Sequence, residues 1–141
     1  MSGRWHSGIY HVLHPEKYIG SRPPQFRSDW ERVCMTLFDS NPAVTHWSSE
    51  SITIPYKNPL TGKQSNYIPD FFVVYCDKFG QTKAEIVEVK PRSQTSLLEA
   101  KSKHDKLHAV INQAKWVACR NYCKLHGFAF RILTEGEIFR K

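Results

Sequence analysis

Two short segments of this 141-residue chain decide the fold that we expect: Ile68-Pro69-Asp70-Phe71 and Val87-Glu88-Val89-Lys90-Pro91. The first lies in a strand-forming run over residues 67–76, and the second ends a similar run over residues 84–90. The residues between them, 77–81, are typical of a turn. The sequence therefore predicts a β-hairpin that brings the two segments together.

This hairpin would gather charged side chains at one end of its two strands. Successive side chains of a strand alternate between its faces, so Glu88 and Lys90 point to the same side. With the turn centred near Phe79-Gly80, Asp70 falls opposite Val89 or Lys90, about 5 Å away across the ladder. Asp70 and Glu88 are then close enough to share one cation.

Two carboxylates at this spacing predict a metal site, because without a cation they repel each other. Oxygen ligands suit Mg²⁺, for which Mn²⁺ is expected to substitute, and the main-chain carbonyl of Val89 is a further candidate ligand. Lys90 would orient the attacking water, help to deprotonate it and stabilise an anionic transition state. The predicted reaction is phosphodiester hydrolysis. The alternative is that Asp70 is a turn residue and that residues 88–90 form an exposed, charged strand end.

Elements on the N-terminal side of the hairpin have recognisable boundaries. Ser28-Asp29-Trp30-Glu31 has the spacing of a capping box, and the helix that it opens should end at Asn41-Pro42. Alternating apolar residues predict one strand over residues 47–56. A turn over residues 58–62 follows.

After the hairpin the pattern becomes helical from Gln94 or Thr95 to His126, as one long helix or two abutting ones. Ser96-Leu97-Leu98-Glu99 is a second possible capping box, and Gly127 is a typical helix stop. A short strand over residues 128–133 and a final helical turn complete the chain. This order predicts an α/β fold with a mixed central sheet of about four strands flanked by helices.

Composition favours a polyanionic partner. Lysine and arginine total 20 against 13 acidic residues, which gives a net charge of +7, and the pI is about 9.3. Neither a membrane-spanning run nor a signal peptide is evident, so a soluble, cytoplasmic protein without a membrane partner is expected. Cys34, Cys76, Cys119 and Cys123 should be reduced, and Cys119 and Cys123 fit a buried helix face better than a partial zinc site with His126.

Residues 1–27 form an irregular basic arm, and residues 28–141 form the main domain in this interpretation. The arm either contacts phosphates or a protein partner or is a solvated leader on the core, and its basic residues are Arg4, His11, Lys17, Arg22 and Arg27. The long helix offers a second basic surface, either a solvated face or a track for a phosphate backbone, made of Lys101, Lys103, Lys106, Lys115, Arg120 and Lys124. His104 and His108 are expected to be surface residues. Gln113 is not counted among the residues of the predicted site.

The Pro69-Asp70 strand followed by Glu88-Val89-Lys90 resembles the PD-(D/E)xK nuclease superfamily. Further segments are similar to the head-completion nucleases of tailed phages, themselves similar to transposon end-cleaving nuclease subunits: Arg27-Ser28-x-Trp30-Glu31, Trp47-Ser48-Ser49-Glu50, Ile54-Pro55-Tyr56 and Tyr67-Ile68-Pro69-Asp70-Phe71. The resemblance covers about residues 20–140 and implies a restriction-endonuclease-like core in residues 28–141.

The resemblance also implies a site. Glu31, Asp70 and Glu88 would hold Mg²⁺, and Lys90 would act on the water, giving 5′-phosphate and 3′-hydroxyl ends. The alternative for Glu31 is a local bond to the backbone amide of its own cap. Glu50 is expected to support the site indirectly.

By this resemblance the protein would be a metal-dependent DNA endonuclease acting in genome packaging and head completion, in the host cytoplasm during phage assembly or associated with the virion. Partners would be DNA and portal, neck or packaging proteins, and cutting of two strands would be easiest for a homodimer. Two rivals remain: a structural head-completion or neck protein that binds DNA or portal without turnover, and a nuclease subunit that cuts only with a transposase-like partner.

Overall fold

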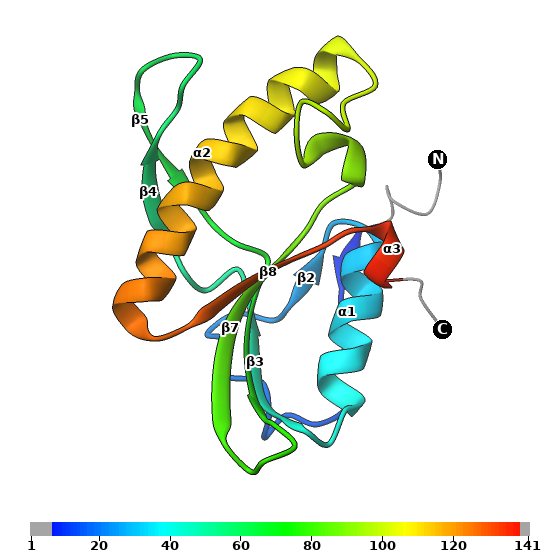
Figure 1. Cartoon of the computed structure of the whole chain (residues 1–141). Coiled ribbons are helices and arrows are strands. Elements are labelled where there is room, and N and C mark those ends of the chain that lie inside the picture. Colours follow the sequence, from blue (N-terminus) through cyan, green and yellow to red (C-terminus); the bar gives the residue numbers. More distant parts are fainter. Residues whose placement is uncertain (1–6, 139–141) are drawn as a thin grey trace.

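The computed structural model describes residues 7–138, so Arg4 of the expected arm and residues 139–141 of the expected main domain lie outside the described residues. A run of consecutive strands separates helix α1 from helix α2 (Figure 1). In chain order they are β1 Gly8–Ile9, β2 Gln25–Phe26, α1 Asp29–Ser40, β3 Val44–Ser49, β4 Ile54–Lys57, β5 Gln64–Tyr67, β6 Phe71–Cys76, β7 Thr82–Val89, η2 Arg92–Gln94, α2 Lys103–His126, β8 Ala129–Leu133 and α3 Glu135–Ile138.

The central sheet has four strands in the order β3-β6-β7-β8. Strand β6 is antiparallel to both β3 and β7, whereas β8 runs parallel to β7. The parallel pairing follows from α2, which carries the chain back across the sheet before β8 begins. The predicted α/β fold with a mixed four-stranded sheet is confirmed, and it agrees with a restriction-endonuclease-like core.

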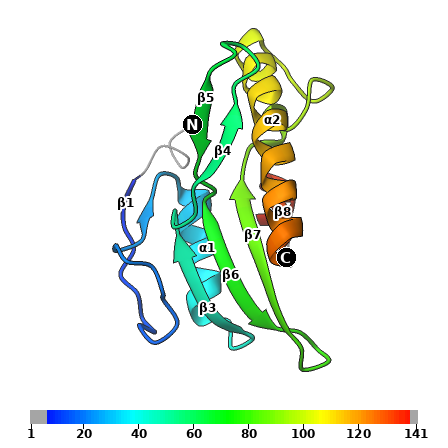
Figure 2. The same cartoon turned by 90° about the vertical axis from the view of Figure 1, so that its left-hand side faces the viewer.

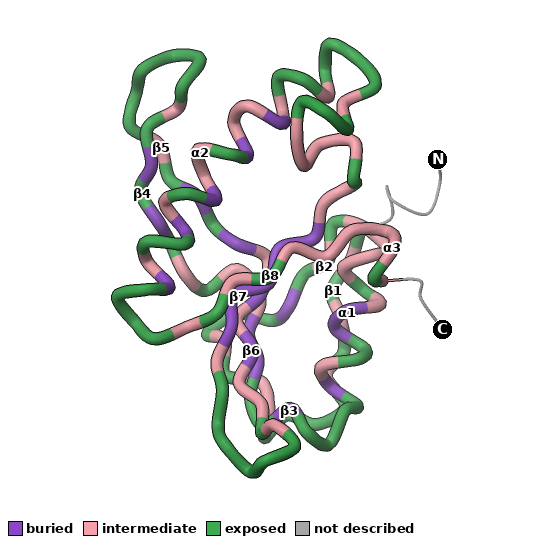
Figure 3. Tube along the Cα trace, viewed as in Figure 1, coloured by how far each residue is buried: buried purple, intermediate pink, exposed green. Residues whose placement is uncertain are grey.

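Each face of this sheet carries its own core, because side chains alternate along β6 and β7. The elements that contribute to the two cores, α1 on one side and α2 with the β4–β5 hairpin on the other, are seen in Figures 1 and 2. Phe71 and Val73 pack with Trp47 and Met35 of α1 on one face. On the other face, Ile86 packs with Trp116 of α2 and with the β4–β5 hairpin. Burial is concentrated in the central strands, whereas the loop tips are exposed (Figure 3).

The hairpin of β6 and β7 is confirmed, with a register different from the expected one. Phe71 pairs with Val87 and Cys76 with Thr82. The turn is therefore centred at Phe79, where Asp77 Oδ1 accepts the backbone N–H groups of Phe79 and Gln81. Continued by one residue, this register places Asp70 opposite Glu88, whereas Val89 or Lys90 was expected.

Two expected strands are each divided. The run over residues 47–56 becomes β3 and β4, which belong to different sheets, because the chain turns away at Glu50, whose φ is +51°. The run over residues 67–76 breaks between β5 and β6 at Ile68-Pro69-Asp70, since proline lacks the N–H that a ladder needs. Strands β4 and β5 pair as a separate hairpin.

Helix α1 begins after its cap Ser28, whose Oγ accepts the N–H of Glu31, as expected. Helix α2 begins later than predicted. Ser96 Oγ does accept the N–H of Glu99, but this bond closes only an isolated turn, and the true cap is Ser102. Gly127 ends α2 with φ +73°, as predicted.

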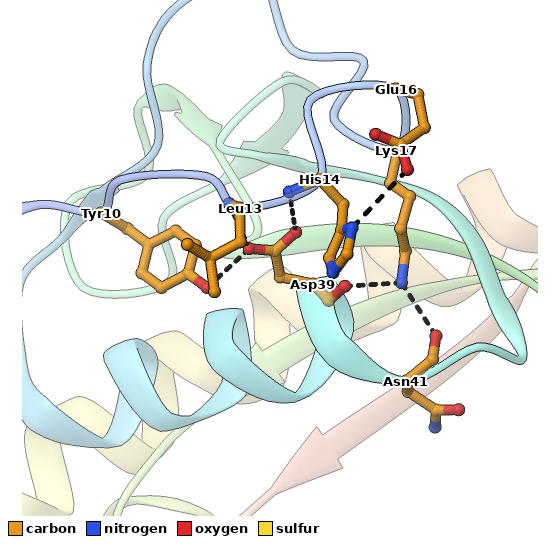
Figure 4. A network of polar contacts seen from close by, with 7 residues as sticks. All are labelled: Tyr10, Leu13, His14, Glu16, Lys17, Asp39 and Asn41. Atoms are coloured by element: carbon orange, nitrogen blue, oxygen red, sulfur yellow. Dashed lines mark hydrogen bonds and ion pairs between the residues drawn. The ribbon is translucent and has the colours of Figure 1, made fainter.

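The described part of the arm is attached to α1 by hydrogen bonds to Asp39 (Figure 4). Its carboxylate accepts from Tyr10 Oη at 2.7 Å, from the Leu13 N–H at 2.7 Å and from the His14 N–H at 3.1 Å. Lys17 Nζ donates to the carbonyls of Asp39 and Asn41, so this lysine helps to attach the arm to the end of α1.

All four cysteines are free thiols, and Cys119 and Cys123 are buried, as expected. Within residues 7–138, no helix has the length and apolar character needed to span a bilayer.

Candidate active site

Asp70 and Glu88 meet where β6 begins and β7 ends. The Asp70 N–H donates to Glu88 Oε1 at 3.2 Å, and the Val89 N–H donates to Asp70 Oδ2 at 2.8 Å. Each carboxylate is thus fixed by the backbone of the opposite strand. Pro69 places Asp70 just outside the β6–β7 ladder, which leaves the Asp70 backbone free to make this bond.

Lys90 follows directly on β7. Its Nζ lies 3.8 Å from Glu88 Oε2, and its side chain is 25% exposed, which leaves it accessible to a ligand. Its backbone N–H donates to the Leu133 carbonyl on β8, so the neighbouring strand fixes its position. Asp70, Glu88 and Lys90 are therefore brought together as predicted.

Glu31 reaches the same place from the first turn of α1. Its Oε1 accepts the backbone N–H of Arg27 at 3.1 Å, while its own N–H donates to Ser28. Burial raises the pKa of Glu31 to about 7, and the negative charge of Asp70 adds to the shift. The Glu31 carboxylate therefore bonds to the amide of Arg27, one residue before the cap, and not to the Ser28 amide that the alternative considered, while it lies within electrostatic range of Asp70.

The three carboxyl groups impose a shared electrostatic cost. Burial raises the pKa of Asp70 to about 6, although the Val89 N–H and Lys90 oppose the shift. Burial and then the charge of Asp70 raise the pKa of Glu88 to about 8. Full ionisation is therefore unfavourable without more positive charge than Lys90 provides.

The arrangement also shows what a metal ion would need. Across residues 7–138, no group of three or more His, Cys, Asp or Glu side chains is placed so that it could hold a metal ion as it stands. One oxygen of Asp70 and one of Glu88 bond to backbone N–H groups, so each carboxylate has one oxygen without a backbone donor, and that of Glu88 lies 3.8 Å from Lys90 Nζ. The donor set is chemically suited to Mg²⁺, since all three groups offer anionic oxygen.

Glu50 adjoins this group through its backbone. Its N–H donates to the Asp70 carbonyl at 2.9 Å, and its carboxylate pairs with Arg27 at 3.1 Å. Its φ of +51° is unusual for a residue with a side chain. Glu50 thus holds Arg27 and the Asp70 backbone, which is consistent with the supporting position expected for it.

Helix α2 and strand β5 add two side chains that sequence reasoning did not single out. The Tyr67 hydroxyl is buried close to Glu88, and burial, then the charge of Glu88, raise its pKa. Lys115 is half-buried, and its charge acts on Glu88 and Asp70. Lys115 was one of six basic residues of the helix region, and only the packing of α2 on β4 and β5 distinguishes it from the others.

Other residues considered from sequence lie elsewhere. Gln113 Nε2 donates to the Thr95 carbonyl on the loop before α2. The rings of His104 and His108 lie 4.2 Å apart between centroids. His104 is exposed, as expected, whereas His108 is half-buried and lies within the electrostatic range of Lys90.

Known proteins provide an independent comparison. The model of a family described as "TnsA-like endonuclease N terminal" matches residues 41–135. The head completion nuclease of Enterobacteria phage T4 is 30% identical to this chain over 144 residues, which cover 94% of the chain and 93% of that relative. The family match spans Asp70, Glu88 and Lys90, whereas Glu31 lies before it.

Proposed function

The chain belongs to the TnsA-like endonuclease family, and on this premise we propose that it is a metal-dependent DNA endonuclease acting in phage head completion. One observation carries the proposal most directly: the buried carboxyl group of Glu88 and the half-buried one of Asp70 lie beside Lys90 at the end of a hairpin, within electrostatic range of a third, Glu31. This combination of residues is suited to hydrolysis of a phosphodiester bond.

The metal ion that we propose is Mg²⁺, with Mn²⁺ as a substitute, held by the carboxylates of Glu31, Asp70 and Glu88 and by the Val89 carbonyl. The raised pKa values of the three carboxyl groups support this choice, because a divalent cation would remove the repulsion that causes part of the shifts. Bound there, the ion would supply a Lewis acid that lowers the pKa of a water molecule.

The protein's own residues account for orientation and charge. Lys90 is placed to donate a hydrogen bond to the attacking water and to stabilise the negative charge that develops on the phosphate. Two backbone N–H groups keep Asp70 and Glu88 in fixed orientations, so little reorganisation is needed when substrate arrives. Arg27 offsets the charge of Glu50 beside the site.

The role in head completion rests on the similarity to the phage T4 protein, whose name gives it that function. We propose that this chain likewise acts on DNA and with portal, neck or packaging proteins, in the host cytoplasm or associated with the virion. A homodimer would be the simplest way to cut both strands. The two rivals, a structural protein without turnover and a subunit that needs a transposase-like partner, make different predictions in one assay.

That assay is cleavage of supercoiled plasmid by the isolated protein at low salt, with Mg²⁺, Mn²⁺ or EDTA. We expect nicked or linear DNA with either metal and none with EDTA. DNA binding without nicks would favour the structural protein. Cleavage that starts only when a partner protein is added would favour the partner-dependent subunit, and either result would contradict an autonomous endonuclease.

A further inference from the structure

Lys115 lies on an aromatic platform beside the candidate active site. Its Nζ is 5.6 Å from the ring centroid of Tyr67 and 5.9 Å from that of Tyr56, and these two rings come from the paired strands β5 and β4. Both rings are buried. Cation–π contacts with two fixed rings restrict the positions that the lysine side chain can adopt.

The same lysine lacks an anionic partner of its own. Among the described residues, the ion pairs do not include Lys115, although the side chain is half-buried. The charged groups that act on it are Lys90, Glu88 and Asp70. Burying a cation without a contacting anion is costly, so the structure maintains this arrangement at an energetic penalty.

A second basic residue lies on the same side of α2. His108 precedes Lys115 by seven residues, about two helical turns, so both side chains share one face. The charges that act on His108 are those of His104, Lys90, Lys115 and Asp105, of which only Asp105 is acidic. Burial and these cations lower the pKa of His108, so its imidazole is neutral at neutral pH and the positive charge beside the site comes from Lys115 and Lys90.

We propose that Lys115, held over Tyr56 and Tyr67, binds a phosphate of the DNA backbone that lies next to the phosphate at which the strand is cut. The proposal deepens the endonuclease function and rests on it. A phosphate would give the half-buried ammonium the anion that the protein does not provide. The contact would add affinity and fix the register of the strand, but it would not read the base sequence.

The test compares Lys115→Met with Lys106→Met. Methionine keeps an apolar stem that can pack on the two rings. Lys106 is exposed on the same helix, and nine residues, about two and a half turns, place it on the opposite face. Binding of a fluorescent duplex oligonucleotide is measured in EDTA over a range of salt concentrations, so that no turnover is required.

We expect Lys115→Met to reduce the slope of log K against log salt concentration by about 0.9, the value for one lost phosphate contact. Lys106→Met should keep the native slope, and Lys115→Arg should restore it. Equal slopes for Lys115→Met and the native protein would overturn the proposal. So would a Lys115→Arg protein that behaves like Lys115→Met, because packing rather than charge would then be responsible.

Steady-state cleavage gives a second readout. With Mg²⁺, Lys115→Met should raise KM several-fold and change kcat by less than about twofold, because a uniform binding contact is lost. A change confined to kcat would contradict the phosphate contact. Native protein that binds DNA but never cuts would count against the endonuclease function alone, since the binding slopes would still decide the role of Lys115.

Discussion

The individual carboxyl groups of the site carry a pH dependence that can be measured without substrate. Burial raises the pKa of Glu31, Asp70 and Glu88 to about 7, 6 and 8. In the unfolded chain these groups titrate near pH 4. The folding stability that these groups contribute is therefore fully present below about pH 4, and it is lost as the pH rises through 6 to 8.

Glu88→Gln isolates one of these groups. In EDTA at pH 8.5 we expect the variant to exceed the native protein in unfolding free energy by at least about 1 kcal/mol, because glutamine needs no costly ionisation. Near pH 4 the advantage should disappear, because Glu88 is then largely protonated in both the folded and the unfolded protein. Mn²⁺ should stabilise the native protein at pH 8.5 and the variant much less. Urea unfolding at both pH values measures all three effects, and a variant that gains nothing at pH 8.5 would contradict them.

Glu50 provides a test of backbone strain. Its φ of +51° is unfavourable for a residue with a Cβ atom but not for glycine. Glu50→Gly should therefore be more stable than Glu50→Ala by about 1 kcal/mol, since both variants lose the carboxylate and only glycine relieves the strain. Ser49 is the matched control, because it lies in β3 without a positive φ, and there glycine should be the less stable variant. Thermal unfolding of the variants measures these differences in stability. Equal stabilities of Glu50→Ala and Glu50→Gly would contradict backbone strain at Glu50.

Among the elements, α2 offers a comparison between its expected and observed starts. Ser102 Oγ accepts the Asp105 N–H at the true N-terminus, whereas Ser96 Oγ accepts the Glu99 N–H in an isolated turn. Ser102→Ala should cost about 1 kcal/mol of stability, the usual value for a lost helix cap. Ser96→Ala should cost less than about 0.5 kcal/mol. Chemical denaturation of the two variants gives the ranking, and a larger loss at Ser96 would place the helix start there.

Asp39 joins the arm to α1. Burial alone would raise its pKa, but hydrogen bonds from Leu13, Tyr10 and His14 outweigh burial and hold the pKa below its usual value. Its contribution to stability is therefore complete above about pH 4 and is lost as the pH falls through the lowered value. Asp39→Asn should cost about 2 kcal/mol at pH 7, because an amide accepts these bonds less well.

Proteolysis can locate that effect. Asp39→Asn should expose the arm to cleavage within residues 7–27 before the main domain is cut. Glu16→Gln, which removes an exposed carboxylate 3.7 Å from His14, is the control and should change stability by less than about 0.5 kcal/mol. If the protease digests the main domain without first releasing an arm fragment, Asp39 does not stabilise the arm specifically.

The sequence predicts the elements whose boundaries depend on nearby residues. The start of α1 at Ser28, the end of α2 at Gly127 and the β6–β7 hairpin depend on caps and turns, which are local. The division of residues 47–56 is not predictable in this way, because Ile54 and Tyr56 alternate as in a continuing strand but belong to a separate hairpin. The left-handed conformation of Glu50, where the chain turns, has no glycine to indicate it.

At the scale of the whole molecule, the site likewise combines residues that local patterns group with residues that only long-range packing brings together. Asp70, Glu88 and Lys90 come from one hairpin, so spacing and alternation are enough to group them. Glu31 comes from another element, and only family resemblance suggested it. Tyr67 and Lys115 are brought to the site by the packing of α2 on β4 and β5, the second core of the molecule, which local patterns do not reveal.

Two cores on opposite faces of one sheet also explain why the site lies where it does. Helix α1 brings Glu31 from one core, whereas α2 brings Lys115 from the other, and the ends of β6 and β7 lie between them. The charged groups are thus held by elements that are fixed through their own packing. Such a scaffold supports the preorganisation that a catalytic centre needs.

The most direct measurement is metal-dependent plasmid cleavage by Glu31→Gln, Asp70→Asn, Glu88→Gln and Lys90→Met beside Glu85→Gln. Glu85 is the matched control, a buried carboxylate on the same strand that pairs with Arg131 on the opposite face. We predict that each of the four variants folds and loses at least about 100-fold in rate, whereas Glu85→Gln cuts like the native protein. Native rates in Asp70→Asn or Lys90→Met would contradict the assignment of the catalytic centre.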